Sequence, residues 1–407
     1  MSGALQVPVF RWLFAGQAVS AIGDQVFPVA VAALVVTGGG TAGELGLVLA
    51  ARFGALVLFA LLGGVWADRL PRVRVLRGAD LLRLVAVAGL AVAAASGTPP
   101  VVVLAGLVFL VGAGEAFFRP AFGALLPTVL PADSLAAGNA LSSTAQQLAL
   151  VVGPGLAGGL LLVGETWVVF AVDALTFAVS LATLLKVTEP PRAPAPRRRM
   201  VAEMAEGVAA VRARPWVGAV LLVATTQLLV ISAPLMVLLP VVVGDPSAYG
   251  LVLAVGAVGG LLGALACSRW RPAHRGRVGL LLLMTWAAPP LALLAQAPTP
   301  VLAGAWFLAH LGTSPFIIWW ETALQASVPR ELLARVVSLD WLCSLALLPA
   351  GLALTGPVVS LVGRTPVLLA AAGVALVSSG LPLLVPGVVD FRSPAKPITQ
   401  DRAGCRR

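Results

Sequence analysis

The sequence predicts an all-α membrane protein with twelve transmembrane helices in two six-helix pseudo-repeat halves. The chain is 59% hydrophobic and only 11% charged, whereas soluble domains carry about 25% charged residues. It divides into twelve apolar stretches of about 20 residues, the length that an α-helix needs to cross a bilayer. Two short motifs also recur about half a chain length apart, which indicates an internal duplication.

The predicted spans alternate with short polar segments. The first span is longer than a signal-peptide core and has no clear cleavage site before the later spans, so we expect it to be retained. The predicted units are residues 1–187 and 216–389 as the two six-helix halves, 188–215 as a cytoplasmic linker and 390–407 as a basic cytoplasmic tail. The spans are 10–36, 43–67, 75–96, 99–121, 139–163, 166–187, 216–243, 248–268, 277–296, 299–321, 334–356 and 364–387.

The linker from Thr188 to Pro215 combines prolines, three consecutive arginines and a short amphipathic stretch. Prolines without an apolar run favour an extended segment. The part from Met200 to Arg214 carries apolar residues at helical spacing, which predicts an amphipathic helix lying on the membrane.

Basic residues follow the even-numbered spans, and this distribution predicts the orientation. The opposite loops contain mainly acids, with Arg364 as the exception. By the positive-inside rule, both termini are cytoplasmic and the protein lies in the inner (cytoplasmic) membrane. The net charge of +10 is then explained by topology, and no nucleic-acid partner is expected. The arginines that follow spans two, four, six, eight and ten include Arg69, Arg72, Arg74, Arg77, Arg119, Arg192, Arg212, Arg269, Arg275, Arg330 and Arg335.

Two motifs support the duplication. Residues 129–136 recur as residues 327–334, an offset of 198 residues, and residues 64–68 correspond to residues 263–267, an offset of 199. Parallel repeats of this kind are related by an axis along the membrane normal and place a ligand site near the midplane between the halves.

The segment after span two resembles the loop between the second and third helices of major facilitator superfamily (MFS) transporters. The family pattern is Gly-x-x-x-Asp-Arg-x-Gly-Arg-Lys, and here Pro71 and Val73 depart from it. A plain positive-inside loop is the alternative interpretation. The resemblance implies that this segment acts as a gate. The matching residues are Gly64, Asp68, Arg69 and Arg72.

Further motifs resemble the MFS subgroup of macrolide-efflux-like and enterobactin-exporter-like proteins. They lie at residues 23–24, 112–121, 138–141 and 173–177. The resemblance extends to about Val389 and implies the MFS fold and export by alternating access. It does not identify the compound that is exported.

Asp24 in the middle of span one is the first candidate for coupling or substrate binding. A charge inside a bilayer costs about 2.5–3.5 kcal/mol on insertion scales, so each one needs a reason. Asp24 could exchange a proton or hold a cationic substrate. Alternatively, it could form a structural ion pair with Arg52 of span two, because their depths differ by only about 5 Å.

Glu115 and Glu321 are further candidates for substrate or proton coupling. Glu115 lies inside the cytoplasmic end of span four, where Arg72 or Arg119 could instead bind it as part of a gate. Glu321 follows two tryptophans at the end of span ten, where a solvated helix end is the simpler interpretation.

His310, in the middle of span ten, could relay protons or form a structural hydrogen bond to a neighbouring helix. Asp173 and Asp340 are two more buried acids. We expect Asp340 to approach the arginines of the Asp68 loop, and the resemblance implies that Asp68 docks on span eleven.

Span five carries proline and glycines that predict a bend at the interface of the halves. The motif resembles the Gly-Pro-x-x-Gly-Gly signature of drug/proton antiporters, with one extra residue before the glycine pair. A packing kink alone is the alternative. The residues are Gly153, Pro154, Gly158 and Gly159.

These features predict a secondary active exporter of an amphiphilic small molecule (a drug, antibiotic or siderophore-like compound), driven by proton antiport. The alternatives are an MFS importer of a nutrient and a non-transporting sensor or assembly protein on the same fold. The sequence contains no Walker A pattern. Its three cysteines form no CxxC motif, and its histidines form no cluster. We therefore expect no enzyme activity, no cofactor and no metal. The expected partners are a small molecule and the lipid bilayer. The oligomeric state is left open, and a monomer is one of the possible states.

Overall fold

The computed structural model describes residues 2–189 and 200–391, with only the backbone described at 2, 61–69, 200–205, 330, 331, 334 and 344. Twelve stretches of this described part are long and apolar enough to cross a membrane. The first six are α2 to α7, and the last six are α9–η1–α10, α11, α12–η2–α13, α14, α15–α16 and α17–η3. The helices are α1 (Ser2–Leu5), α2 (Pro8–Thr37), α3 (Ala42–Arg69), α4 (Arg72–Ala95), α5 (Val101–Val129), α6 (Leu135–Val163), α7 (Thr166–Leu184), α8 (Met200–Arg212), α9 (Pro215–Gln227), η1 (Leu228–Ser232), α10 (Ala233–Val243), α11 (Pro246–Arg269), α12 (Arg275–Leu283), η2 (Met284–Ala287), α13 (Ala288–Leu294), α14 (Thr299–Ser327), α15 (Arg330–Ala346), α16 (Leu348–Val362), α17 (Arg364–Gly380) and η3 (Leu381–Leu384).

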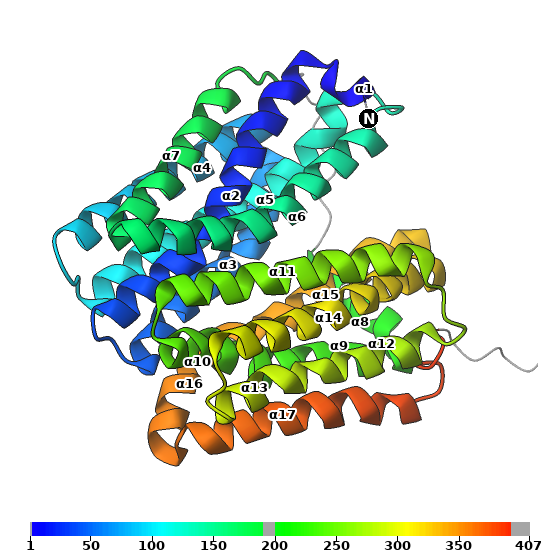
Figure 1. The fold of residues 1–407 in the computed structure, drawn as a ribbon. Coiled ribbons are helices and arrows are strands. Elements are labelled where there is room, and N and C mark those ends of the chain that lie inside the picture. Colours follow the sequence, from blue (N-terminus) through cyan, green and yellow to red (C-terminus); the bar gives the residue numbers. More distant parts are fainter. Residues whose placement is uncertain (1, 190–199, 392–407) are drawn as a thin grey trace, which may run out of the picture.

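The helices form two groups, with α1–α7 above and α9–α17 below in Figure 1. Helix α6 of the first group packs against α11 of the second, and α3 packs against α16. The predicted all-helical fold with twelve spans is therefore confirmed. Because twelve crossings return the chain to its starting side, α2 begins and α17–η3 ends on the same side of the membrane.

Two spans extend beyond their predicted ends at residues 121 and 321. Helix α5 continues to Val129 and α14 to Ser327, so the polar residues in their last turns lie within helices. Each helix ends at a residue in extended conformation that precedes a proline, Leu130 or Val328, because proline disfavours the helical conformation in the residue before it. Both copies of the 129–136 repeat thus occupy the same junction in their groups.

Three spans of the second group are interrupted near prolines. A π-helical turn precedes Pro234, a 3₁₀ turn precedes Pro289 and Pro290, and a non-helical residue precedes Leu348 and Pro349. Proline lacks an N–H and collides with the carbonyl four residues earlier, so the helix rearranges there.

The linker helix α8 packs on the protein as well as presenting a surface outward. Glu206 forms an ion pair with Arg335 of α15, and Gly207 lies so close that an added Cβ would be 2.8 Å from Leu339. The predicted helix of the linker is present and α15 covers part of its surface, while its placement on the membrane stays a prediction.

The close contacts between the two groups lie at the helix ends opposite the N-terminus. A Cβ added to Gly356 would lie 2.1 Å from the Cα atom of Gly43, and one added to Gly158 would lie 2.9 Å from the Ser247 carbonyl oxygen. These backbone contacts require glycine. Beside them, Asp245 caps α11 by accepting hydrogen bonds from Ser247, which lower the pKa of the Asp245 carboxyl.

We predict that Gly356→Val forces these ends apart, because the clash is with backbone atoms that cannot rotate away. The measurement is the distance between spin labels at positions 37 and 361, which are exposed at the ends of α2 and α16. The distance should increase in Gly356→Val. It should stay unchanged in Gly373→Val, where no described atom lies within 4 Å of an added Cβ; equal distances in both variants would contradict the prediction.

Candidate functional site

The ion pairs inside the described membrane spans all lie in the first group of helices. They form two networks, one around Arg83 and one around Glu115. The participating side chains come from α2, α3, α4, α5 and α7, so both networks depend on how these helices pack. The charged residues are Asp24, Arg52, Asp80, Arg83, Glu115 and Arg119.

Arg83 is bound by two carboxylates. Asp80 lies one turn before it on α4 and forms an ion pair with it, while the Arg83 Nη1 atom is 3.3 Å from Asp24 Oδ1 on α2. Ser180 of α7 donates a hydrogen bond of 2.6 Å to the other oxygen of Asp80, and Gln17 donates one of 3.1 Å to Ser180. This chain of hydrogen bonds fixes Asp80 and, through it, the guanidinium.

Aromatic rings and a glycine complete the pocket around Arg83. Its guanidinium carbon lies 4.4 Å from the ring centroid of Phe118 and 4.5 Å from that of Phe177, distances at which a cation is attracted to the ring face. A Cβ on Gly114 would lie 2.6 Å from Arg83 Cγ, so glycine leaves room for the arginine stem.

The members of this network differ in exposure. The side chains of Asp80 and Arg83 are 0% and 2% exposed, whereas that of Asp24 is 32% exposed. Pro28 lies four residues after Asp24 within α2 and has no N–H to donate to the Asp24 carbonyl. Asp24 is therefore the partly exposed acid of this network.

The second network is centred on Glu115 of α5. Arg52 of α3 donates hydrogen bonds of 3.3 Å and 3.1 Å to Glu115 Oε2, and Arg119 donates one of 3.0 Å to Oε1. The guanidinium of Arg119 also lies 5.4 Å from the ring centroid of Trp341 on α15. One carboxylate thus joins two arginines, and the second arginine contacts the other group of helices.

The predicted pairing of Asp24 with Arg52 is wrong. Their predicted depths are similar, but depth does not determine which side of a helix faces which neighbour. Arg52 turns toward α5 and binds Glu115, and Asp24 turns toward α4 and binds Arg83. The alternative that Arg119 binds Glu115 is confirmed.

Glu321 and His310 lie in the second group and join neither network. Glu321 is exposed and forms no ion pair with a described residue. The His310 ring lies 5.3 Å from that of Trp286, and its Nδ1 atom is 3.0 Å from the Trp306 carbonyl oxygen. The Trp306 carbonyl belongs to the same helix, α14, so the predicted hydrogen bond from His310 to a neighbouring helix is not found among the described residues.

Asp340 and Asp173 are placed differently from one another. Asp340 accepts a hydrogen bond of 3.4 Å from Trp320. Its expected approach to the arginines of the loop after α3 stays a prediction, because the Arg69 side chain lies outside the described residues. Asp173 is fully buried; its Oδ1 atom is 3.4 Å from the Thr176 hydroxyl, and its Oδ2 atom has no hydrogen-bond partner among the described residues.

The predicted gate is only partly described. The side chains of Gly64, Asp68 and Arg69 lie outside the described residues, as does any docking of Asp68. Helix α3 continues through Arg69 and α4 begins at Arg72, so the connection is two residues long. Arg72 is buried, and its Nε atom is 4.0 Å from Glu189 Oε1. Glu189 therefore ties the end of the first group to this connection, which the sequence did not indicate.

Helix α6 is continuous through the predicted kink at Pro154. Gly153 and Gly158 serve close packing, against Gln25 of α2 and Ser247 near the start of α11 respectively. Gly159 does not, because an added Cβ would meet no described atom within 4 Å. Of the glycine pair, only Gly158 therefore contributes to close helix packing among the described residues.

Asp80, Ser180 and Gln17 were not predicted as members of the network around Arg83. The signal was present, because two opposite charges three residues apart in an apolar span lie on one helix face. Such a pair is expensive in a membrane unless it is buried and bound by further groups.

The family model described as "transmembrane secretion effector" matches residues 2–395. The chain belongs to this family of MFS transporters. Its curated relatives include macrolide efflux protein A of Streptococcus pyogenes, with 29% identity over 58% of this chain and 59% of the relative. This chain thus spans about three fifths of the length of that relative.

A second sequence relative and two solved structures are similar to this chain over most of its length. The enterobactin exporter EntS of Shigella boydii is 27% identical over 81% of this chain and 80% of its own. A bacterial homologue of the iron transporter ferroportin in the inward-facing state has a TM-score of 0.73 and 17% identity, covering 92% of this chain and 98% of its own. The outward-facing structure of a bacterial ferroportin homologue has a TM-score of 0.60 with the same coverages. The family and these relatives are transporters, not enzymes.

We predict that Arg83→Gln lowers the Tm of the purified protein far more than Arg119→Gln does. Removing one partner of a buried ion pair costs about 3–5 kcal/mol, whereas the Arg119 side chain is 53% exposed and an exposed pair contributes about 0–1 kcal/mol. The double variant Asp80→Asn/Arg83→Gln should recover part of the loss. Equal shifts in Tm for the two arginine variants would contradict the prediction, as would additive effects in the double variant.

Proposed function

We propose that this protein exports an amphiphilic small molecule by alternating access of its two helix groups, driven by proton antiport. The observation that carries the proposal is Asp24, a partly exposed carboxylate bound to an arginine that a second, fully buried carboxylate also binds. The names of the relatives support export as the direction of transport, since they include a macrolide efflux protein and an enterobactin exporter.

The Arg83 network suits reversible binding of a proton or a cation at Asp24. When Asp24 is protonated or binds a cationic substrate, it releases Arg83, and the guanidinium keeps the charge of Asp80. The cost of freeing Asp24 is therefore lower than it would be if Arg83 were left in the membrane without an anion. Proton and substrate can then compete for one site without destabilising the fold.

Alternating access also requires a state that is open to only one side of the membrane, and the contacts between the two groups support such a state. The glycine contacts hold together the helix ends opposite the N-terminus, which the arginine distribution assigns to the outer side. The TM-score is higher to an inward-facing ferroportin homologue (0.73) than to an outward-facing one (0.60), which also supports a state that is closed on the outer side. We propose that this state takes up substrate from the cytoplasm or the inner leaflet. Coupling requires proton and substrate to bind the two states with different affinities.

We predict that Asp24→Asn abolishes proton-driven efflux while leaving protein levels and Tm near those of the wild type, because the side chain is partly exposed. Efflux is measured as reduced accumulation of ethidium and as resistance to a panel of antibiotics that includes erythromycin, in a pump-depleted bacterial host. The protonophore-treated wild type should accumulate as much dye as the variant.

Asp133→Asn is the matched control, since Asp133 is an exposed acid at the junction before α6. It should export like the wild type. Efflux that persists in Asp24→Asn and still requires the proton gradient would exclude Asp24 as the coupling acid. If no compound in the panel is moved by the wild type, export of many amphiphilic drugs is rejected in favour of a dedicated exporter, an importer or a non-transport role.

A further inference from the structure

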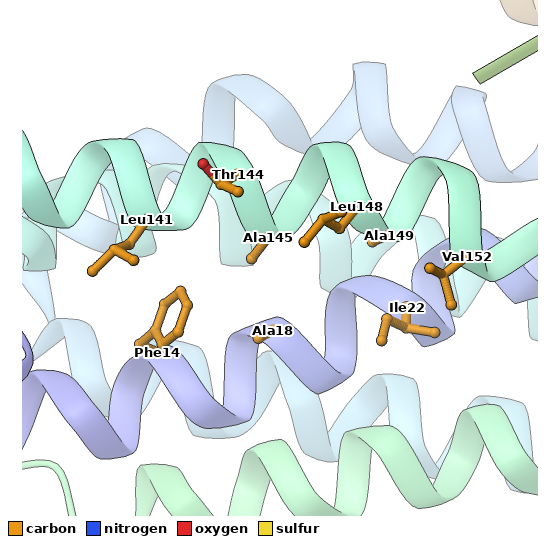
Figure 2. Close-up of a pocket in the computed structure, with 9 residues that line it drawn as sticks. All are labelled: Phe14, Ala18, Ile22, Leu141, Thr144, Ala145, Leu148, Ala149 and Val152. Carbon is orange, nitrogen blue, oxygen red and sulfur yellow. The ribbon is translucent and has the colours of Figure 1, made fainter. Parts of the chain in front are cut away.

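A cavity of about 330 Å³ lies between α2 and α6, apart from the charged networks. Figure 2 shows Phe14 of α2 and Leu141, Leu148 and Val152 of α6 pointing into the space between the two helices. The lining is apolar except for one threonine, and it comprises Phe14, Ala18, Ile22, Leu141, Thr144, Ala145, Leu148, Ala149 and Val152.

The cavity exists because the two helices approach closely near both of its ends but not between them. Near one end, a Cβ on Gly153 would lie 2.4 Å from Gln25 Cβ, and near the other, a Cβ on Gly138 would lie 3.4 Å from the Phe10 ring. Between these contacts the facing residues include Ala18 and Ala145, whose methyl groups are too short to fill the gap. We call this space the α2–α6 groove.

The α2–α6 groove faces the bilayer. Its α6 residues, such as Leu148 and Val152, lie on one helix face that continues toward the other end of α6 as Leu156 and Val163, and all four are exposed. At that end the two groups are in backbone contact, so an exposed apolar residue there faces lipid. Gln146 and Gln147 lie on other faces of α6, because successive residues are about 100° apart around the axis.

The dimensions and charge of the α2–α6 groove match one leaflet. Leu141 and Val152 are eleven residues apart, which is about 16 Å along a helix, and half of the hydrocarbon core is about 15 Å. Arg11 lies one turn before Phe14 on the same face of α2, at the end near the N-terminus. It is exposed and has no hydrogen bond or ion pair from its side chain to a described residue.

From these features we infer that the α2–α6 groove binds a phospholipid of the leaflet on the N-terminal side, with an acyl chain between the helices and its phosphate on Arg11. The site is separate from the proposed transport site, and the inference does not depend on what the protein exports.

The lining excludes a polar solute as the regular occupant. The only polar side chain in it, Thr144, donates its hydroxyl to the Ala140 carbonyl at 2.8 Å, so that donor is already used. An amphiphilic drug would leave its polar groups without partners in the groove, at a cost in free energy for each one. An acyl chain has no such groups, and the lipid phosphate can bind Arg11, which supplies the charge at the mouth.

The test is photo-cross-linking of the full chain in phosphatidylethanolamine vesicles containing phosphatidylglycerol with a diazirine on one acyl chain. We expect labelling to concentrate on residues 14–22 and 141–152. Ala145→Trp and Ala18→Phe fill the groove from opposite walls, and each should remove most of this labelling. Arg11→Gln should reduce it by weakening the hold on the phosphate.

Two control variants make the same kinds of substitution at positions outside the α2–α6 groove. Leu162→Trp places the same large side chain on a lipid-facing position, where Leu162 is 73% exposed, and Arg364→Gln removes an exposed arginine at the start of α17. Both should label like the wild type, and the Tm of every variant is measured to confirm folding.

Three outcomes would overturn the inference. One is labelling spread evenly over all lipid-facing helices and insensitive to Ala145→Trp and Ala18→Phe. Another is displacement of the label by an exported compound such as ethidium, which would make the groove part of the transport path. The third is cross-linking of α6 between two copies of the chain in place of lipid, which would make this face a dimer interface.

Discussion

The burial of Arg83 among α2, α4, α5 and α7 is the constraint on which the first group of helices depends. A guanidinium in the middle of a membrane is tolerated only when anions and hydrogen-bond acceptors surround it. Asp80 and Asp24 supply the anions, and two phenylalanine rings cover the cation. Ser180 donates a hydrogen bond to Asp80 and accepts one from Gln17. The identities of small residues such as Gly114 follow from the same demand, because the arginine stem occupies the space that a side chain would take.

The two networks divide the work that a transporter of this kind requires. Around Arg83, Asp80 is fully buried and Asp24 is partly exposed, so Arg83 keeps the Asp80 carboxylate as a partner when its contact with Asp24 is lost. Around Glu115, the charges link α3 and α5, and Arg119 extends this link to Trp341 in the other group. The first arrangement suits ligand exchange, and the second lets the position of one group influence the charges in the other.

The sequence was sufficient for the fold because hydropathy, the positive-inside pattern and the internal repeat each act over many residues. The spans at Pro8–Thr37 and Pro246–Arg269 were predicted to within two residues at each end. Ion partners were harder. Asp24 and Arg52 have similar depths, yet they face different helices, and rotation about a helix axis is set by packing that no local pattern records. The Asp80–Arg83 pair was visible in the sequence, but without the fold nothing distinguished a buried pair from two charges at a helix end.

The interrupted spans of the second group have a mechanical consequence. A continuous helix resists bending because every turn is hydrogen-bonded to the next, and a span that changes to π or 3₁₀ geometry loses this regularity at one point. Two of the six spans in the second group contain such a point in their interior, α15–α16 is interrupted at Leu347, and α17 continues as the 3₁₀ helix η3, whereas α2 to α7 are unbroken. We therefore expect that bending during the proposed rocking motion concentrates at these interruptions in the second group.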